Sequence, residues 1–284
     1  MARRNLNGLR MLVTGASQGI GRALVLEAAK RGCRVLAAAR SQTLLDELAA
    51  ESTKTSSTVK TVAADVTKPE DRTAMVAAAT QHFSGLDVLV NNAGIGATGH
   101  FMDSEPDVLR QIFETNFFGL AETTRAFLPL LKQGVKPAIV NISSVLGKRA
   151  IPGRSLYAAS KFAVMGFSEA IRAELAKDGI DVLVVSPGLT KTNFSKNMLE
   201  QKAKIQLDHL RGMTSEEVAI ATLRAIERGT LDVTLTFKGK LLLLVNRFAP
   251  WIIDKVAKKK VRELFADEIA ERKKKLTEAV TNAS

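Results

Sequence analysis

The sequence predicts an α/β protein with a doubly wound parallel sheet. Between residues 10 and 188, short and nearly continuous apolar runs alternate with stretches whose apolar residues recur at helical spacing. Strands of this kind need cover on both faces, which the crossover helices of a parallel sheet provide. With 284 residues, of which 46% are hydrophobic, the chain can bury one large core. We therefore expect one domain whose ligands bind beyond the carboxyl ends of the strands, where the strand order reverses.

The first predicted elements are a strand, a glycine turn and a helix. "RMLVTGA" (10–16) is an apolar run, and "GRALVLEAAKRG" (21–32) has the apolar spacing of an amphipathic helix that ends at Gly32. The same alternation then repeats along the chain. Strands are predicted at 33–40, 61–66, 86–94, 137–145 and 181–188, and helices at 43–52, 69–83, 106–132 and 156–179.

The alternation stops after residue 188, and two further segments follow. Residues 190–213 mix polar residues with scattered apolar ones, among them Phe194, Met198, Leu199, Ile205 and Leu207. Because a long insertion after the carboxyl end of a strand commonly covers a site, we expect a lid here. We assign residues 1–236 to the main domain, lid included, and 237–284 to a basic, partly apolar C-terminal extension.

Composition excludes several kinds of site. The single cysteine, Cys33, rules out an internal disulfide, and its apolar surroundings predict a buried thiol in a reducing compartment. The three histidines (His82, His100 and His209) lack the spacing of metal ligands, so we expect no metal. No apolar stretch of signal-peptide length precedes the first strand. We expect a cytoplasmic protein.

The turn "TGASQGIG" (14–21) carries glycines at Gly15, Gly19 and Gly21 between the first strand and its helix. Missing side chains let the backbone approach a pyrophosphate, which the free N–H groups at the helix start attract. Ser17, Gln18 and Ile20 lie in the same turn, so the whole turn is a candidate dinucleotide site. A tight connection without a ligand is the alternative reading of this turn alone.

The end of the second predicted strand indicates which dinucleotide fits. A cofactor without a 2′-phosphate is usually held by a carboxylate at this point, but the sequence reads "AAARS" and offers Arg40 and Ser41. The planar guanidinium suits a phosphate. We therefore favour NADP(H) over NAD(H); the alternative is a solvated loop arginine.

Two further strand ends carry candidate cofactor contacts. Asp65, beside Val66 in "ADV", could accept a hydrogen bond from an adenine amino group. Asn92 and Gly94 in "NNAG" leave room for the backbone to approach a ribose. Either stretch could also be ordinary loop chemistry.

The candidate catalytic residues are Tyr157 and Lys161 in "SLYAASK", with Ser144 at the end of an earlier strand. Positions i and i+4 of a helix share a face, so the phenol and the amine project together. A nearby ammonium would lower the pKa of the tyrosine and suit it to acid–base catalysis. Ser144 would hydrogen-bond the same substrate oxygen. Such a pair alone is common on helix surfaces. In a chain that also carries a candidate dinucleotide-binding turn, it indicates a catalytic site.

These motifs together resemble the short-chain dehydrogenase/reductase family in its shorter, single-domain branch. "TGASQGIG", "ADV", "NNAG", "ISS", "YAASK" and "SPGLTKT" occur in the order of the family, over about residues 8–192. The resemblance implies a Rossmann-type fold and an Asn-Ser-Tyr-Lys tetrad in which Asn116 joins the three residues above. It also implies that Lys161 holds the nicotinamide ribose. By the same resemblance, the nicotinamide end contacts Pro187, Gly188, Thr190 and Thr192. Gln18 stands where many NADP-binding members carry a basic residue.

The C-terminal extension contains an apolar run, 241–253, with basic flanks at Lys238, Lys240 and 258–260. Residues 238–284 hold twelve Lys and Arg against six Asp and Glu, so half of the net charge of +12 lies there. The run is too short to span a bilayer as one helix. It suits an interfacial segment on an anionic membrane. A helix that covers the substrate cleft, or a subunit contact, fits equally well.

We expect an NADP(H)-dependent oxidoreductase that interconverts a carbonyl and an alcohol on a small, lipophilic substrate. The apolar lid and extension motivate the substrate class, with Leu146, Leu189, Phe194 and Met198 as candidate pocket residues. We also expect a homo-oligomer, peripheral on a membrane if the extension binds one. The main alternative is a nucleotide-sensing or scaffold protein on the same fold. A nucleotide-sugar epimerase would need a larger C-terminal domain, and the apolar run beside the basic residues argues against nucleic-acid binding.

Overall fold

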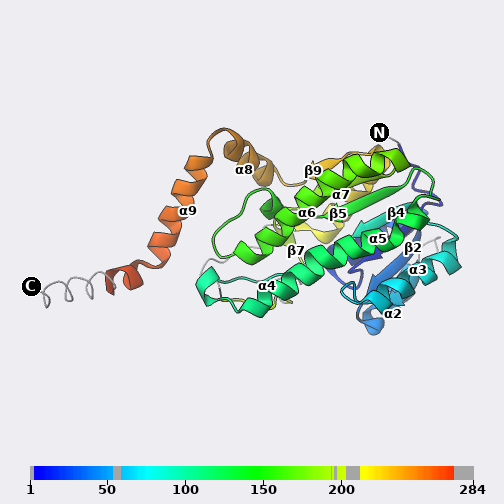
Figure 1. Cartoon of the computed structure of the whole chain (residues 1–284), viewed down its shortest axis with the longest axis horizontal. Helices are drawn as coiled ribbons and strands as arrows, with labels where there is room; N and C mark the ends of the chain where they lie inside the picture. Colours follow the sequence, from blue (N-terminus) through cyan, green and yellow to red (C-terminus); the bar gives the residue numbers. More distant parts are fainter. Residues whose placement is uncertain (1–2, 54–58, 193, 195–196, 203–211, 272–284) are drawn as a thin grey trace, which may run out of the picture.

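A seven-stranded parallel sheet forms the centre of the computed structural model (Figure 1), which describes residues 3–53, 59–192, 194, 197–202 and 212–271. The strand order is β3-β2-β1-β4-β5-β6-β9, so the order reverses between β1 and β4. The strands are β1 (Arg10–Thr14), β2 (Arg34–Ala39), β3 (Val59–Ala63), β4 (Val88–Asn91), β5 (Ala138–Ile142), β6 (Asp181–Ser186) and β9 (Asp232–Thr234). This arrangement confirms the predicted doubly wound sheet.

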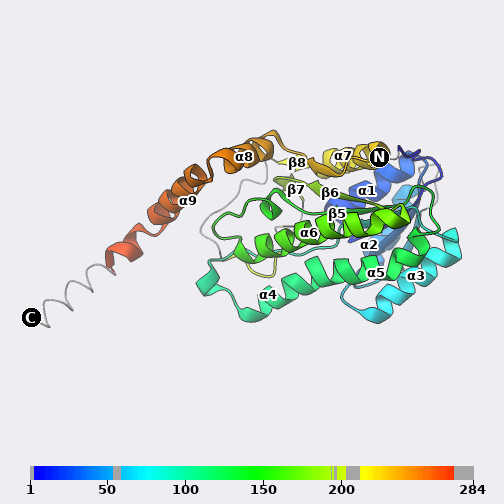
Figure 2. The ribbon, with the colours of Figure 1, turned by 45° about the horizontal axis from the view of Figure 1, so that its top comes forward.

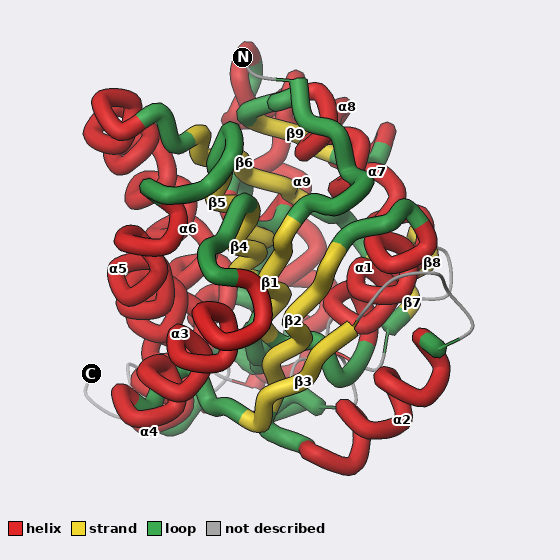
Figure 3. The backbone as a smooth tube through the Cα atoms, turned by 90° about the vertical axis from the view of Figure 1, so that its right-hand side faces the viewer, coloured by secondary structure: helices red, strands yellow, loops and turns green. Residues whose placement is uncertain are grey.

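Two layers of helices cover the sheet, as Figure 3 shows. The layer on one face contains α1 (Gly19–Lys30), α2 (Gln42–Ser52) and α7 (Ser215–Arg228). The layer on the other contains α3 (Pro69–Phe83), α4 (Pro106–Phe113), α5 (Gly119–Leu131) and α6 (Ser155–Glu174). Short turns of 3₁₀ helix lie at Phe101–Asp103, Val145–Gly147 and Leu175–Asp178.

The two faces of the sheet explain the nearly continuous apolar strands. In β1, Met11 and Val13 pack into the core below α1 and α7, whereas Leu12 packs into the opposite core with α3 and α5. All three side chains are fully buried. Since successive side chains of a strand point to opposite faces, a strand covered on both sides needs apolar residues at every position.

The helix expected over 106–132 is interrupted in the structure. Residues Glu114–Phe118 form a turn of π-helix between α4 and α5. The apolar residues before and after the turn each recur at helical spacing, so the periodicity of the sequence alone did not reveal it. Asn116 lies in the turn.

Part of the expected lid lies within the described residues. Two short strands, β7 (Thr190–Lys191) and β8 (Met213–Thr214), pair in parallel at its ends. Between them, the Leu199 N–H donates to the Gly96 carbonyl at 2.9 Å, which holds this stretch beside the loop after β4. Ile205 and Leu207 lie outside the described residues.

The C-terminal extension forms two helices, α8 (Phe237–Phe248) and α9 (Pro250–Leu264), which Pro250 separates. Figures 1 and 2 both show α9 running outward from the body of the protein. Arg149 attaches this arm to the body through a 3.0 Å hydrogen bond to Asn246 and an ion pair with Asp254. No helix among the described residues has the length and apolar character needed to cross a membrane.

A buried ion pair joins three strands at the amino ends of the sheet. Asp87, just before β4, accepts hydrogen bonds from the backbone N–H and guanidinium of Arg10 in β1 and from the Val135 N–H before β5. Burial alone raises the pKa of the Asp87 carboxyl, but the hydrogen bonds from Arg10 and Val135 and the charge of Arg10 outweigh it and hold this pKa below 3.8. The ionised form is therefore stabilised by folding.

We predict that this ion pair makes the free energy of unfolding depend on pH in the acidic range. Because the pKa of Asp87 is lower in the folded chain, its contribution is complete above pH 3.8 and is lost as the pH falls through the folded value. Asp87→Asn should reduce the free energy of unfolding at neutral pH by about 3 kcal/mol. The deficit should shrink at about pH 3. Urea denaturation followed by circular dichroism measures both values.

Asp178→Asn is the matched control, because Asp178 pairs at 3.2 Å with a half-exposed Lys132. Its cost should stay below about 1 kcal/mol. An Asp87→Asn deficit that is unchanged between the two pH values would contradict the proposed role of the carboxylate.

Candidate active site

One cavity of about 580 Å³ lies beyond the carboxyl ends of the strands, where their order reverses. Most of the residues selected from the sequence line it: Gly15, Ser17, Gln18, Gly19, Ile20, Arg40, Ser41, Asp65, Val66, Asn92, Gly94, Ser144, Tyr157, Lys161, Pro187, Gly188, Thr190 and Thr192. Gly21 and Asn116 do not line it. They lie behind its wall, and each has a packing role described below.

The glycine turn brings backbone close to backbone. A Cβ at Gly21 would lie 2.3 Å from the Gly15 carbonyl oxygen, and a Cβ at Gly15 would lie 2.7 Å from the Ala93 Cα. Gly15 and Gly19 also have positive φ angles of 63° and 56°. Gly21 is therefore needed for the turn to pack against α1, and it need not touch a ligand.

The amino end of α1 opens into the cavity. Gln18, the N-cap residue, makes no side-chain cap, and its carboxamide oxygen instead accepts a 3.1 Å hydrogen bond from Asn197 of the lid. The first N–H groups of the helix therefore have no capping side chain, and the positive end of the helix dipole faces the cavity through Gly19 and Ile20. Such an end fits the pyrophosphate of a dinucleotide.

The charges around the cavity favour an anionic ligand. Among the described lining residues, Arg40, Arg154, Lys161 and Lys238 are basic, and Asp65 is the one acid. The Asp65 carboxylate already accepts hydrogen bonds from the N–H and hydroxyl of Thr67 at 3.0 and 2.8 Å. The excess of cations matches a ligand that carries phosphates.

Arg40 is exposed at the end of β2 and makes no hydrogen bond or ion pair within the part of the chain that the structure describes. The neighbouring Ser41 caps α2, because its hydroxyl accepts a hydrogen bond from the Leu44 N–H at 3.4 Å. The guanidinium is thus free to bind a phosphate at this end of the cavity. It occupies the position where a protein that binds a cofactor without a 2′-phosphate usually carries a carboxylate.

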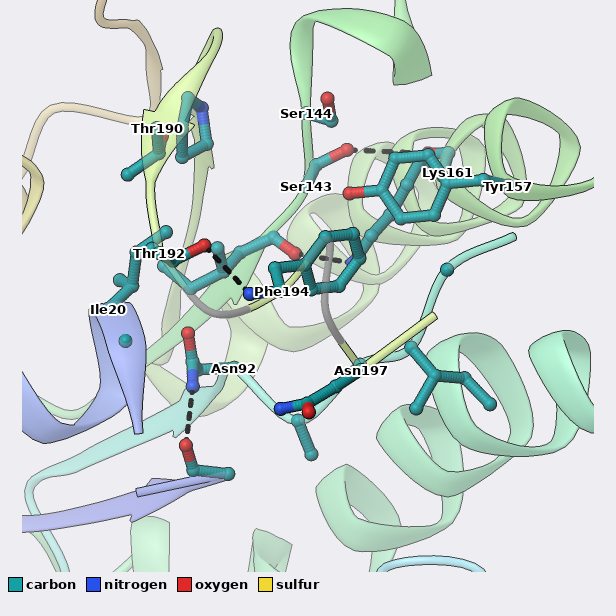
Figure 4. Close-up of a pocket in the computed structure, with 18 of the residues that line it drawn as sticks. Ile20, Asn92, Ser143, Ser144, Tyr157, Lys161, Thr190, Thr192, Phe194 and Asn197 are labelled. Atoms are coloured by element: carbon teal, nitrogen blue, oxygen red, sulfur yellow. Dashed lines mark hydrogen bonds between the residues drawn. The ribbon is translucent and has the colours of Figure 1, made fainter. Parts of the chain in front are cut away.

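Tyr157, Lys161 and Ser144 meet at the other end of the cavity (Figure 4). Lys161 is buried, and its Nζ donates to the Ile142 carbonyl at 2.9 Å while lying 5.8 Å from the centre of the Tyr157 ring. Ser144 lies beside the Tyr157 phenol and lowers its pKa, and the Ser144 Oγ accepts a 3.1 Å hydrogen bond from the Leu146 N–H. The phenol, the hydroxyl and the amine therefore form one cluster.

The expectation that the lysine lowers the tyrosine pKa is wrong for this site. Burial raises the pKa of Tyr157 to about 12, and the hydrogen bond with Ser144 only partly opposes this. Burial also lowers the pKa of Lys161 to about 8. The amine is directed to the Ile142 carbonyl, so the loss of solvation decides the state of the phenol. At neutral pH, Tyr157 is a proton donor.

Asn116 positions the wall behind the cluster. Its side chain is fully buried, accepts from the Ile95 N–H at 2.8 Å, and donates to the Ile95 carbonyl and the Ser160 hydroxyl at 3.0 Å each. A Cβ at Gly94 would lie 3.2 Å from this amide oxygen and 3.7 Å from the Lys161 Nζ. Asn116 thus fixes the loop after β4 against α6, close to the lysine.

The wall around the Tyr157 end is apolar. The four candidate pocket residues, Leu146, Leu189, Phe194 and Met198, all line the cavity. The Phe194 ring lies edge-on to Tyr157 with 5.7 Å between ring centres. Helix α8 adds Leu242, with Thr236, Lys238 and Gly239 around its first turn. The interpretation of the C-terminal extension as a cover of the substrate cleft therefore applies to the first turns of α8.

Sequence reasoning missed Arg154, which also lines the cavity. Its position three residues before Tyr157, just ahead of the predicted helix 156–179, was a usable signal, because it puts the residue beside the first turn of that helix. Burial, which makes this arginine unusual, was not readable from the sequence. Among the described residues, no group of three or more His, Cys, Asp or Glu could hold a metal.

Comparisons with known proteins agree with this geometry. Residues 10–203 match the family described as short chain dehydrogenase. A dehydrogenase/reductase SDR family protein 7-like from Anopheles gambiae is 35% identical over 270 residues, 90% of this chain and 85% of that protein.

Two solved structures share the fold and carry bound nucleotides. A short chain dehydrogenase from Burkholderia cenocepacia in complex with NADP is 27% identical with a TM-score of 0.75, covering 89% of this chain and 99% of that one. A 3-ketoacyl-(acyl-carrier-protein) reductase from Brucella melitensis complexed with NADH is also 27% identical, with a TM-score of 0.71, covering 81% and 98%.

We predict that Tyr157 titrates above the usual range. It is the single tyrosine of the chain, so the ultraviolet absorbance of tyrosinate reports this residue alone. The folded protein should show a midpoint near 12, against about 10 for the chain unfolded in urea. Ser144→Ala should raise the midpoint further, because it removes the hydrogen bond that favours the phenolate. A folded midpoint at or below 10 would show that burial does not control the phenol.

Proposed function

Because the chain belongs to the short-chain dehydrogenase/reductase family of oxidoreductases, we propose that it interconverts a carbonyl and an alcohol with NADP(H) on a lipophilic substrate. The observation that carries the proposal is the single cavity that joins the two ends of the reaction. A cationic, nucleotide-sized end at α1 and β2 leads to an apolar end where Tyr157 and Ser144 meet.

The preference for NADP(H) rests on Arg40. A free guanidinium at the end of β2 can hydrogen-bond a 2′-phosphate, and the cavity has no acid there to take a ribose hydroxyl. Relatives with bound NADP and with bound NADH both occur among the solved structures. The residue at this position, and not the fold, is therefore the basis of the proposed preference.

The chemistry of the chain follows from the protonated phenol. When bound, a nicotinamide cofactor supplies hydride for reduction and accepts it in oxidation. Tyr157 gives its proton to the carbonyl oxygen as negative charge develops there, and the Ser144 hydroxyl stabilises the same oxygen. Lys161, with a pKa of about 8, carries a charge that stabilises the phenolate once the proton has left.

The apolar wall supports a lipophilic substrate. Leu189, Phe194, Met198 and Leu242 surround the space next to Tyr157, and they offer no hydrogen bonds to the hydroxyls of a sugar. Burial of such a wall against a long-chain or polycyclic carbonyl is favourable by about 25 cal/mol per Å². A polar substrate would lose hydration there without replacement.

We predict that the protein oxidises NADPH in the presence of lipophilic carbonyls more efficiently than with small polar sugars. Absorbance of the reduced nicotinamide, with NADPH and NADH tested separately, measures the rate. Tyr157→Phe should lower kcat by at least roughly 100-fold, because a positioned general acid contributes about that much. Arg40→Gln should raise KM for NADPH by roughly 10-fold, as a lost charged hydrogen bond does, and leave KM for NADH nearly unchanged.

Arg110→Gln is the matched control, since Arg110 is exposed on α4 and lies outside the cavity. It should change neither constant. Binding of NADPH without turnover of any carbonyl would instead favour a nucleotide-sensing or scaffold protein. Equal rates with sugars and lipophilic carbonyls would reject the substrate class.

The proposal places the protein in the cytoplasm, at a membrane surface through α8 and α9. Phe237, Leu241, Leu244 and Phe248 follow one face of α8 and are exposed, and Trp251 and Val256 of α9 are about two-thirds exposed, at 65% and 63%. Basic residues flank these side chains: Lys238, Lys240, Arg247, Lys255, Lys258, Lys259 and Lys260. Apolar side chains flanked by cations fit the interface of an anionic bilayer.

We predict that this arm binds vesicles of phosphatidylcholine and phosphatidylglycerol, and that binding weakens with salt. Phe248→Ser with Trp251→Ser should reduce binding by roughly 100-fold, since each buried ring contributes about 1.5 kcal/mol or more. Point substitutions are needed because truncation after Leu235 would also remove cavity residues. Val135→Ser is the control, as Val135 is 70% exposed at the opposite end of the sheet. Co-sedimentation that is equal for all variants would reject the arm as the binding element.

The proposal also includes a homo-oligomer. Phe118 and Phe162 lie on adjacent helical segments and are 48% and 45% exposed, which gives a second copy an apolar contact surface. Light scattering would test this, because a monomer of 30.6 kDa would exclude it.

A further inference from the structure

Arg154 is a buried arginine that faces the cavity without a partner. It lies at the amino end of α6, is 8% exposed, and lines the cavity with Tyr157. Its Nη1 is buried and has no hydrogen-bond partner, and its guanidinium forms no ion pair within the part of the chain that the structure describes. Burial lowers the pKa of this guanidinium, although an arginine stays charged.

Two other arginines with little exposure, Arg4 and Arg10, are paired; their side chains are 1% and 17% exposed. Arg4 donates to the Asp181 carboxylate at 2.6 Å and to backbone carbonyls at Lys136 and Pro137. Arg10 makes its ion pair with Asp87. Because a buried charge without a partner is costly, such residues are normally held by an anion. Arg154 differs from both, because its guanidinium has no such partner among the described residues and lies at the wall of the cavity.

Among the described residues that line the cavity with Arg154, Asp65 is the one acid. Besides Ser144 and Lys161, the lining at the Tyr157 end is largely apolar, with Leu146, Ile151 and Phe194 among its side chains. Asp65, the acid among the described lining residues, follows β3 at the edge of the sheet and is bonded to Thr67. None of the described lining residues therefore pairs with the Arg154 guanidinium, which is open to a ligand in the cavity.

The phosphates of a dinucleotide do not account for this cation either. Arg40 and the amino end of α1 lie at the other end of the cavity, as argued above. The end that contains Tyr157 and Arg154 receives the nicotinamide, which carries an amide and no anionic group. The anion must belong to the second reactant.

We propose that Arg154 binds an anionic oxygen group, a carboxylate or a phosphate, on the lipophilic carbonyl substrate. The proposal rests on the function proposed above and makes it narrower: the substrate is an acidic amphiphile. Arg154 is the N-cap residue of α6 and precedes Tyr157, in the first turn, by three residues, so the anion and the carbonyl are held from the same end of one helix. Lys238, exposed where α8 meets the cavity, adds positive charge at the rim and would attract the same substrate.

Binding without turnover tests the site directly. Isothermal titration calorimetry of the full chain with decanoate, decyl phosphate and decanol compares two anions with a neutral molecule of equal chain length. The wild type should bind at least one anion roughly 10- to 100-fold more tightly than decanol, as a charged hydrogen bond predicts. The tighter of the two anions identifies the group. Equal affinity for all three ligands would overturn the proposal, and this result needs no variant.

The variant Arg154→Gln should remove the preference for the anion and leave the affinity for decanol unchanged. Arg154→Lys should restore part of it, because the charge is kept and the planar fork is lost. Arg110→Gln, which removes one exposed positive charge, should bind like the wild type. Tight anion binding by Arg154→Gln would overturn the proposal. The melting temperature of Arg154→Gln should stay near that of the wild type, since the guanidinium makes no hydrogen bond or ion pair within the described residues.

Kinetics separate this proposal from the proposed function. With NADPH, an oxo acid should be reduced with a higher kcat/KM than its methyl ester, and Arg154→Gln should abolish the difference through KM. Turnover of neutral ketones with no such difference leaves the reductase and rejects the anion site. Selective binding of decanoate or decyl phosphate without turnover of any carbonyl leaves the anion site and rejects the reductase.

Discussion

The site depends on how closely two loops meet where the strand order reverses. Asn92, after β4, donates its side-chain amide to the carbonyls of Thr14 and Gly15, at 3.0 and 3.1 Å. The Thr14 hydroxyl accepts in turn from the N–H groups of Asn92 and Ala93. These bonds hold the glycine turn against the loop after β4, with no room for a Cβ at Gly15. This junction fixes both the open amino end of α1 and the loop after β4, where Gly94 lies close to the Lys161 amine.

Much of the fold could be predicted from the sequence, because its signals are local. The continuous apolar runs of β1 or β6 can only belong to strands covered on both sides, and the glycine turn and Tyr157 stand at the strand and helix ends where the fold places them. Short or polar elements gave no such signal. Strand β9, Asp232–Thr234, has three residues and pairs only with β6, so no period could be read from it.

The errors at the site have a common cause, which is that burial depends on tertiary contacts. The spacing of Tyr157 and Lys161 correctly puts the two side chains on one face. It could not show that the amine is directed to the Ile142 carbonyl, or that lost solvation outweighs its charge at the phenol. The same holds for Arg154, which reads as an ordinary polar residue until its surroundings are known. The position of these residues in the fold could be predicted from the sequence, whereas their burial and solvation could not.

Helix α8 serves two surfaces at once. Gly239 and Leu242 belong to the cavity wall, whereas Phe237, Leu241 and Leu244 of the same helix face outward. A residue inserted into or deleted from this helix would rotate every later side chain by about 100° and so alter both surfaces together. Recombination between relatives would likewise transfer the two surfaces as one segment. Evolution of this enzyme toward a new substrate is therefore constrained by what the outer face of α8 must contact, and a chimera that exchanges the helix exchanges both properties.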